Sequence, residues 1–407
     1  MLNSIVVIVI TSLSLMILFN NKIKLSPTWR ATVTPLASII GSGFLVSAPL
    51  LILSTGYFAP IAMGVIVVIA YGLGSSMRFN ISHAEAMADN KKLVVLNNLE
   101  LISRITLSVA YLISITFYLK LLSAFFLKGM GIDIPLAQNI ITTIIFLFIG
   151  LTGKFKGLSS LESLEVYSVN IKISIIVALV VSHLIFNFDL MSNGQWTLKI
   201  YPHEKPIDAI QKLLGMLVII QGFETSRYLK GAYSVDMRVR TMKHAQIISG
   251  VIYVIFILST LTAFNDIHQI SETTVVDVCR MIAPALPFML IIAAIMSQFS
   301  AAIADTIGSG GLIQEASRNK ISLNNSYVLI IVIGICLTWL TNIYSIITIA
   351  SKAFAIYYAL QLCVSLYVLK KVDASIKSNL KQFIYTSLLV LMICVVVFGV
   401  SVEAGGH

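Results

Sequence analysis

The amino-acid sequence predicts an all-α polytopic membrane protein with about 12 transmembrane helices. Hydrophobic residues make up 57% of the 407 residues and charged residues only 11%, with a mean hydropathy of +0.93. Soluble domains, in contrast, carry about 25% charged residues. The apolar runs are also long and continuous, which argues against a transmembrane β-barrel, whose spans show alternation over roughly ten residues.

The apolar runs divide the chain into spans of about 17–27 residues, long enough to cross a hydrocarbon core of about 30 Å. The tenth and eleventh spans nearly touch near Asn342–Ser345. Two longer polar connections, Arg78–Glu100 and Asn265–Arg280, have helical character. In order, we expect spans at 2–20, 32–54, 57–77, 101–127, 134–151, 164–187, 207–229, 244–264, 281–307, 326–345, 347–369 and 382–402.

The first span has the length of a signal peptide. No basic segment precedes it, and no cleavage site of small residues follows it. Lys22 and Lys24 follow instead, which is typical of a retained helix that enters the membrane from outside. We therefore expect an additional amino-terminal transmembrane helix at residues 1–22.

The net charge of +10 reflects the loops rather than a nucleic-acid surface. When Met1 is placed outside, most of the 28 Lys and Arg residues fall in loops on the inner side, as the positive-inside rule requires. We therefore expect both termini outside and an integral protein of the cell membrane, such as a bacterial inner membrane.

The sequence offers no signature of catalysis. It contains no metal-ligand cluster, no nucleophile–base set and no nucleotide-binding motif. Its four cysteines form no disulfide framework. We expect a protein that is not an enzyme and needs no metal, cofactor or nucleic acid.

Glycine interrupts the span 32–54 at mid-depth, in Gly41-Ser42-Gly43, with Pro35 and Pro49 on either side. Irregular backbone at this depth is tolerated where it lines a protein-enclosed cavity. Unwinding would expose N–H groups at the start of the second half-helix, which favour an anionic group. In the alternative interpretation, the glycines form a packing face of small residues.

A second interruption lies about 180 residues later, where Gly222 and the acidic Glu224 occur inside the span 207–229. A carboxylate inside a membrane span costs several kcal/mol unless it is paired or hydrated. Glu224 is therefore expected to pair with Arg227, to close a gate or to carry a proton. The alternative is that the helix ends here and Glu224 is interfacial.

Three further polar residues lie inside spans. Lys172 either snorkels to the inner interface or presses as a cation against the carbonyls of the first broken helix. Ser297 and Ser300 share one helix face and either bind a cation, accept hydrogen bonds from Lys172 or bond back to their own helix. Asp305, near the inner end of the same span, reads as a solvated cap.

Together, Gly41-Ser42-Gly43, the lysine after Asn170-Ile171 and Gly222-Phe223-Glu224 resemble the amino acid–polyamine–organocation (APC) superfamily of secondary transporters. The resemblance implies the LeuT-like fold, a 5+5 inverted repeat. The repeats would occupy residues 31–188 and 206–371, with one extra helix at each end, at 1–22 and 380–403.

The resemblance also implies roles at matching positions. The backbone of the first interruption would hold the carboxylate end of a substrate, and that of the second would face its amine or body. Lys172 would resemble the lysine that stands in place of a sodium ion, with Ser297 and Ser300 as further coupling residues. The implied substrate-binding residues are Ile40, Gly41, Ser42, Gly43, Phe44, Ile220, Gln221, Gly222, Phe223 and Glu224.

These observations predict a secondary active transporter that moves an amino acid or a related small amine or zwitterion across the lipid bilayer by alternating access. We expect it to be proton-coupled or ion-independent. The alternatives are a sodium-coupled symporter that uses Ser297 and Ser300, and a non-transporting sensor or scaffold on a transporter fold.

Overall fold

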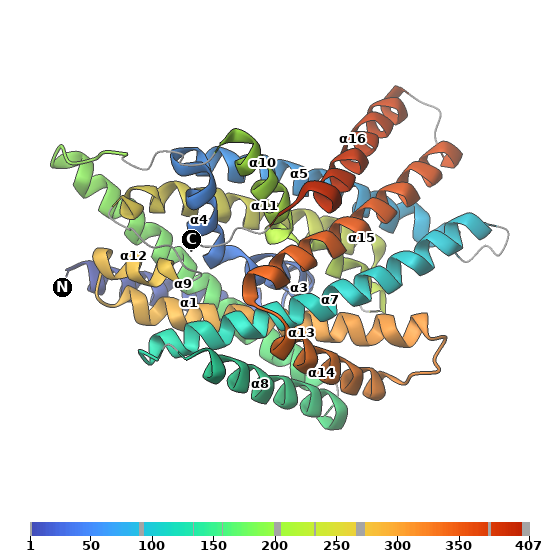
Figure 1. Cartoon of the computed structure of the whole chain (residues 1–407), viewed down its shortest axis with the longest axis horizontal. Helices are drawn as coiled ribbons and strands as arrows, with labels where there is room; N and C mark the ends of the chain where they lie inside the picture. Colours follow the sequence, from blue (N-terminus) through green and yellow to red (C-terminus); the bar gives the residue numbers. More distant parts are fainter. Residues whose placement is uncertain are drawn as a thin grey trace.

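The computed structural model describes residues 2–88, 93–132, 134–156, 158–198, 205–231, 233–265, 273–372 and 376–400. Within these ranges all regular secondary structure is helical. Figure 1 shows the long helices running side by side through one elongated body. The predicted all-α fold is confirmed.

The described part of the chain makes twelve passes, in the predicted order. Nine continuous stretches are long and apolar enough to cross a membrane, and the first of them, Pro27–Met87, contains two passes. A shorter apolar helix and a broken one complete the set. The passes are α1 (Leu2–Leu18), α3 (Pro27–Ser42) with α4 (Phe44–Thr55), α5 (Ala59–Phe79), α7 (Val94–Gly129), α8 (Pro135–Lys156), α9 (Leu158–Ser192), α10 (Pro206–Met216) with η3 (Leu217–Ile220) and η4 (Phe223–Gly231), α11 (Val235–Thr260), α13 (Leu286–Ala316), α14 (Leu323–Leu340), α15 (Ile343–Val372) and α16 (Ile376–Phe398).

Short helices fill the connections. The tight junction expected near Asn342–Ser345 is confirmed, since α14 and α15 are separated by two residues. Residues 266–272 of the outer connection lie outside the described ranges. The short elements are α2 (Asn21–Lys24), η1 (Gly56–Phe58), η2 (Asn80–Ala84), α6 (Glu85–Ala88), η5 (Leu261–Phe264) and α12 (Thr274–Ile282).

The helices form two packed groups around a shared centre. In Figure 1, α5, α10 and α11 lie along one side, α8 and α14 lie along the other, and α3, α7 and α13 run between them. The extra helices pack at the periphery, α1 against α9 and α16 against α15. The predicted LeuT-like order is therefore present: two sets of five passes lie between the added helices α1 and α16. The residue limits of the two repeats stay a prediction.

Small residues let neighbouring helices approach closely. A methyl group at Gly153 of α8 would lie 3.1 Å from the ring of Tyr327 on α14. Nearby, Gly150 faces Ile331 and Gly334 faces Phe146 across the same pair of helices. Because lipid is as apolar as these side chains, close packing of this kind is a main source of helix association in a membrane.

Candidate functional site

The first interruption separates α3 from α4 at Gly43. A methyl group at Gly43 would lie 2.8 Å from the carbonyl oxygen of Ile219, and one at Gly41 would lie 2.5 Å from the Cβ of Ala301. The glycines therefore allow both the break and the close packing that we considered as alternatives. The side chain of Ser42 lies outside the described part of the structure.

Side chains of α13 satisfy the carbonyls at the end of α3. Ser297 Oγ donates to Ile40 O at 2.6 Å and lies 3.1 Å from Gly41 O. Gln298 Nε2 donates to Gly41 O at 2.8 Å. Carbonyls freed at a broken helix inside a membrane need such partners. Gln298 was not predicted as a site residue, although it stands beside Ser297 in the polar part of this span.

Lys172 of α9 lies against the same broken helix. Its side chain is fully buried, and Nζ donates to Ala37 O at 2.8 Å and to Ser300 Oγ at 3.2 Å. Ser300 Oγ in turn donates to Ser297 O. The snorkelling interpretation of Lys172 is thus wrong, and its ammonium group lies between α3 and α13.

Tyr253 of α11 links the two broken helices and was not predicted. Its buried hydroxyl lies 2.9 Å from Ile39 O of α3 and 3.2 Å from Ile219 O of η3. A single tyrosine inside a long apolar run carries no periodic signal, because its partners lie more than 30 residues away in sequence. Only the tertiary arrangement reveals its role.

The second interruption falls at Gln221 and Gly222, between η3 and η4. Gly222 has φ of 111°, in the left-handed region that favours glycine, and it packs directly against Ser38 of α3. The next residue, Phe223, stacks on Tyr358 of α15 at a centroid distance of 5.3 Å. The structure thus brings the two predicted interruptions together at one place.

Glu224 is fully buried, so the interpretation of an interfacial glutamate is wrong. It does not pair with Arg227. One carboxylate oxygen accepts hydrogen bonds from Tyr358 Oη at 2.8 Å and from the amide of Gly222 at 3.0 Å. The other lies 3.4 Å from Tyr111 Oη. Asp305 is also fully buried, so its reading as a solvated cap is wrong too.

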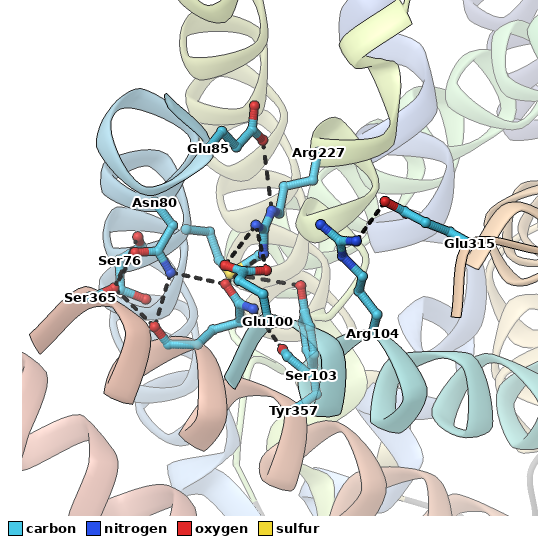
Figure 2. A network of polar contacts seen from close by, with 12 residues as sticks. Ser76, Asn80, Glu85, Glu100, Ser103, Arg104, Arg227, Glu315, Tyr357 and Ser365 are labelled. Atoms are coloured by element: carbon cyan, nitrogen blue, oxygen red, sulfur yellow. Dashed lines mark hydrogen bonds and ion pairs between the residues drawn. The ribbon is translucent and has the colours of Figure 1, made fainter. Parts of the chain in front are cut away.

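Arg227 instead belongs to a network of polar side chains from several helices (Figure 2). Its guanidinium group lies 3.0 Å from Glu100 of α7, 3.7 Å from Glu85 and 2.6 Å from Gln361 of α15. Arg238 of α11 binds Glu85 at 2.7 Å. This network joins η4, which follows the second interruption, to α6, α7, α11 and α15.

A small cavity lies between the broken helices. Its volume is about 20 Å³, measured as the space open to the centre of a water molecule, which is room for about one water. Of the ten predicted substrate-binding residues, Gly43 and Gln221 line it. The full lining is Gly43, Val46, Leu50, Ser114, Phe117, Tyr118, Ile219, Gln221, Ile347, Ala350 and Ser351.

The other predicted substrate-binding residues whose side chains are described do not line this cavity. Ile40 and Gly41 turn their carbonyls to α13. The buried ring of Phe44 packs on Phe256 and Tyr253 of α11. Ile220, Gly222, Phe223 and Glu224 belong to the second interruption described above.

Two larger recesses lie toward the opposite ends of α7. One, of about 510 Å³, is lined by Glu100 and Arg104 near the start of the helix and by Arg227. The other, of about 490 Å³, is lined by Lys128 near its end and by Arg280. A helix of 36 residues spans about 54 Å, so the recesses flank the small central cavity from opposite sides.

The sequence matches a family model described as APC superfamily transporter over residues 21–399. A relative in Aquifex aeolicus (strain VF5), an uncharacterised protein, is 39% identical over 404 residues, which cover 97% of each chain.

Solved structures share the fold at low sequence identity. The nucleobase-cation-symport-1 family transporter Mhp1, closed with bromovinylhydantoin bound, is 12% identical with a TM-score of 0.53, over 90% of this chain and 91% of that one. A manganese transporter of Eremococcus coleocola is 12% identical with a TM-score of 0.54, over 92% and 94%. A Na⁺-coupled sialic acid symporter is 13% identical with a TM-score of 0.54, over 99% of each chain.

The helix order and the paired interruptions define an integral membrane protein with the fold of LeuT-like secondary transporters. The chain belongs to the APC superfamily of transporters.

Proposed function

We propose that this transporter moves an amino acid or a related small amine or zwitterion, and that its cycle is proton-coupled or ion-independent. The observation that carries the coupling proposal is the position of Lys172. Its Nζ donates hydrogen bonds to Ala37 O and Ser300 Oγ, and such carbonyl and hydroxyl oxygens are the ligands that a free cation would need. A covalently attached cation at this place removes the need for a sodium ion.

We place the solute between the two interruptions. Helix α4 begins at Phe44, and Gly43 and Val46 of its first turn line the cavity, so its amino-terminal end favours a carboxylate. Gln221 lines the cavity from the second interruption. The cavity has room for about one water, so we infer that the described conformation is closed and that binding of a solute requires the broken helices to move away from α7 and α15.

Sodium coupling is the alternative that the geometry also favours. Ser297 Oγ, Ser300 Oγ and the carbonyls of Ala37 and Ile40 gather at one place between α3 and α13, and hydroxyl and carbonyl oxygens are ligands for a hard cation. A Na⁺-coupled symporter is among the structural neighbours. In this alternative, Lys172 would be dispensable.

Replacement of Lys172 distinguishes the two. Purified protein is first screened by thermal shift against amino acids, amines and nucleobases, and uptake of each hit is then measured in proteoliposomes under a pH or a sodium gradient. We expect Lys172→Ala to abolish gradient-driven uptake, because an unfilled cation position remains between α3 and α13. Lys352→Ala, which removes a lysine of α15, is the control and should retain uptake. Uptake that needs sodium, ignores a pH gradient and survives Lys172→Ala would refute the proposal.

A further inference from the structure

Two acidic side chains lie in the membrane-embedded centre of the protein. Glu224 belongs to η4 and Asp305 to α13, and both are 0% exposed. The two were not predicted to meet each other, since they are about 80 residues apart and belong to different passes. Buried carboxylates inside a membrane are costly and mark functional sites, with a partner to be identified.

The partners of Asp305 are hydroxyl groups. Ser114 Oγ of α7 donates to Oδ2 at 2.7 Å, and Ser38 Oγ of α3 lies 3.4 Å from Oδ1. The hydroxyl of Tyr118 is a further hydrogen-bond partner. The side-chain partners of Glu224 are likewise the hydroxyls of Tyr358 and Tyr111.

The two carboxyl groups belong to one polar cluster. Ser38, which contacts Asp305, packs directly against Gly222, whose amide donates to Glu224. On the opposite side, Ser114 lies one turn after Tyr111 on α7, and the two side chains contact Asp305 and Glu224 respectively. Five elements therefore converge on the pair: α3, α7, η4, α13 and α15.

Within the described residues, neither carboxyl group contacts a basic side chain. Six basic side chains of these and neighbouring elements have other partners. Lys172 binds Ala37 O and Ser300 Oγ, and Lys120 of α7 binds Thr338 O and Thr341 O of α14. The remaining pairs are Arg227 with Glu100 and Glu85, Arg238 with Glu85, Arg104 with Glu315, and Arg78 with Gln246.

The other titratable groups that face the cluster are phenols. Tyr111 and Tyr118 approach from α7 and Tyr358 from α15, where Tyr357 packs against its ring. Phenols are neutral in the physiological range, so they donate hydrogen bonds without supplying positive charge.

An unsatisfied oxygen stands beside the cluster. Gln221 is 3% exposed, and its Nε2 donates to Tyr118 Oη at 3.1 Å. Within the described residues, Gln221 Oε1 has no hydrogen-bond partner. The residue lines the central cavity together with Ser114 and Tyr118, which supply two of the three hydroxyl groups that contact Asp305. A buried acceptor of this kind requires a donor, and the cavity has room for one water that would connect it to the cluster.

We propose that Glu224 and Asp305 form a buried proton-binding site, which holds at least one proton in this closed conformation. Two carboxylates in one low-dielectric cluster without a cation repel each other and lose their hydration, so protonation is the available means of neutralising them. The cavity and Gln221 supply the route by which a water reaches Asp305. This site is separate from Lys172, and its part in coupling rests on the proposed transport function.

Infrared spectroscopy tests proton binding without knowledge of the solute. Purified protein in lipid nanodiscs is examined for the carbonyl stretch of a protonated carboxyl group between about pH 5 and about pH 9, where exposed carboxyl groups are ionised. We expect this band at neutral pH in the wild type, with a shift on exchange into D₂O. Glu224→Gln and Asp305→Asn should each displace the band, and the double variant should lose it.

Glu100→Gln is the matched control. Glu100 is also buried, but it lies 3.0 Å from the guanidinium group of Arg227, which balances its charge, so this variant should leave the band in place. Lys172→Ala should leave the band in place as well. The amide I band and thermal unfolding show whether each variant is folded.

A wild type without the band, or a band that survives in the folded double variant, would overturn the proton site. If the double variant does not fold, the single variants decide: a band that neither of them displaces would also overturn the proton site. An absence of measurable uptake would count against the proposed transport function and leave the spectroscopic result untouched.

Discussion

Tyr253 illustrates how a single residue holds the site together. One buried hydroxyl serves carbonyls on both broken helices, Ile39 O and Ile219 O. Inside a membrane these carbonyls have no water to replace the phenol. The hydroxyl group should therefore contribute to stability beyond the packing of its ring.

We expect Tyr253→Phe to lower the free energy of unfolding by about 1–3 kcal/mol, the cost of leaving a buried acceptor unsatisfied. Reversible unfolding of the purified protein in detergent measures this change. Tyr327→Phe is the control, because Tyr327 is equally buried and its hydroxyl has no hydrogen-bond partner within the described residues. Equal losses in both variants would show that the hydrogen bonds of Tyr253 add no stability.

The sequence predicted the contacts and burial of some site residues correctly and of others wrongly. A hydrogen bond from Lys172 to Ser300 was one of three alternatives for this serine, and the structure contains it. A pair of Glu224 with Arg227 was one alternative, because the two are close in sequence, but in the fold each side chain turns to a different set of helices. Asp305 was misjudged because hydropathy places a residue along the membrane normal and says nothing of which side of the helix is buried.

At the scale of elements, the network around Arg227 joins η4 to α7 and α15. Its ion pairs are largely buried, with Glu100 only 4% exposed at the side chain. Removing one partner of a buried ion pair leaves an uncompensated charge. Movement of η4 away from α7 therefore requires these pairs to separate together, which gives the network the properties of a gate.

We expect Arg227→Gln to weaken this gate. With the accessible native cysteines replaced, a cysteine in place of Val46 reports access to the central cavity by its rate of reaction with a membrane-impermeant thiol reagent added from the side of Glu100. Arg227→Gln should raise that rate several-fold. Arg104→Gln breaks the more exposed pair with Glu315 and should change the rate little. Equal effects of the two substitutions would contradict the gate.

The pattern of apolar runs predicted the order and approximate limits of the passes, because the length of each run is set by the thickness of the bilayer. Element ends were less predictable. Helix α7 begins at Val94, seven residues before the expected start at 101, and the additional turns carry Glu100, which is buried and paired with Arg227. Tertiary contacts of this kind have no local signature in the chain.

For the whole molecule, the distribution of Lys and Arg predicts both termini outside. Single cysteines in an otherwise cysteine-free protein test this prediction in intact cells. A cysteine at Gly131, after α7, should react with an impermeant maleimide added from outside, and one at Lys320, between α13 and α14, should react only after the membrane is opened. The reverse pattern would invert the topology.

The contact between the two interruptions also has an evolutionary consequence. A side chain gained at position 43 would meet the carbonyl oxygen of Ile219, and one gained at position 222 would meet the carbonyl carbon of Ser38 at 2.7 Å. Side-chain atoms of Ile219 and Ser38 lie nearer still, but the main-chain atoms would remain after any replacement of these residues, so no such replacement makes room. Gly41 differs, since it faces the Cβ of Ala301. A larger residue at 41 can be accommodated when position 301 becomes glycine, whereas glycine at 43 and 222 should be retained throughout a lineage that keeps this closed state.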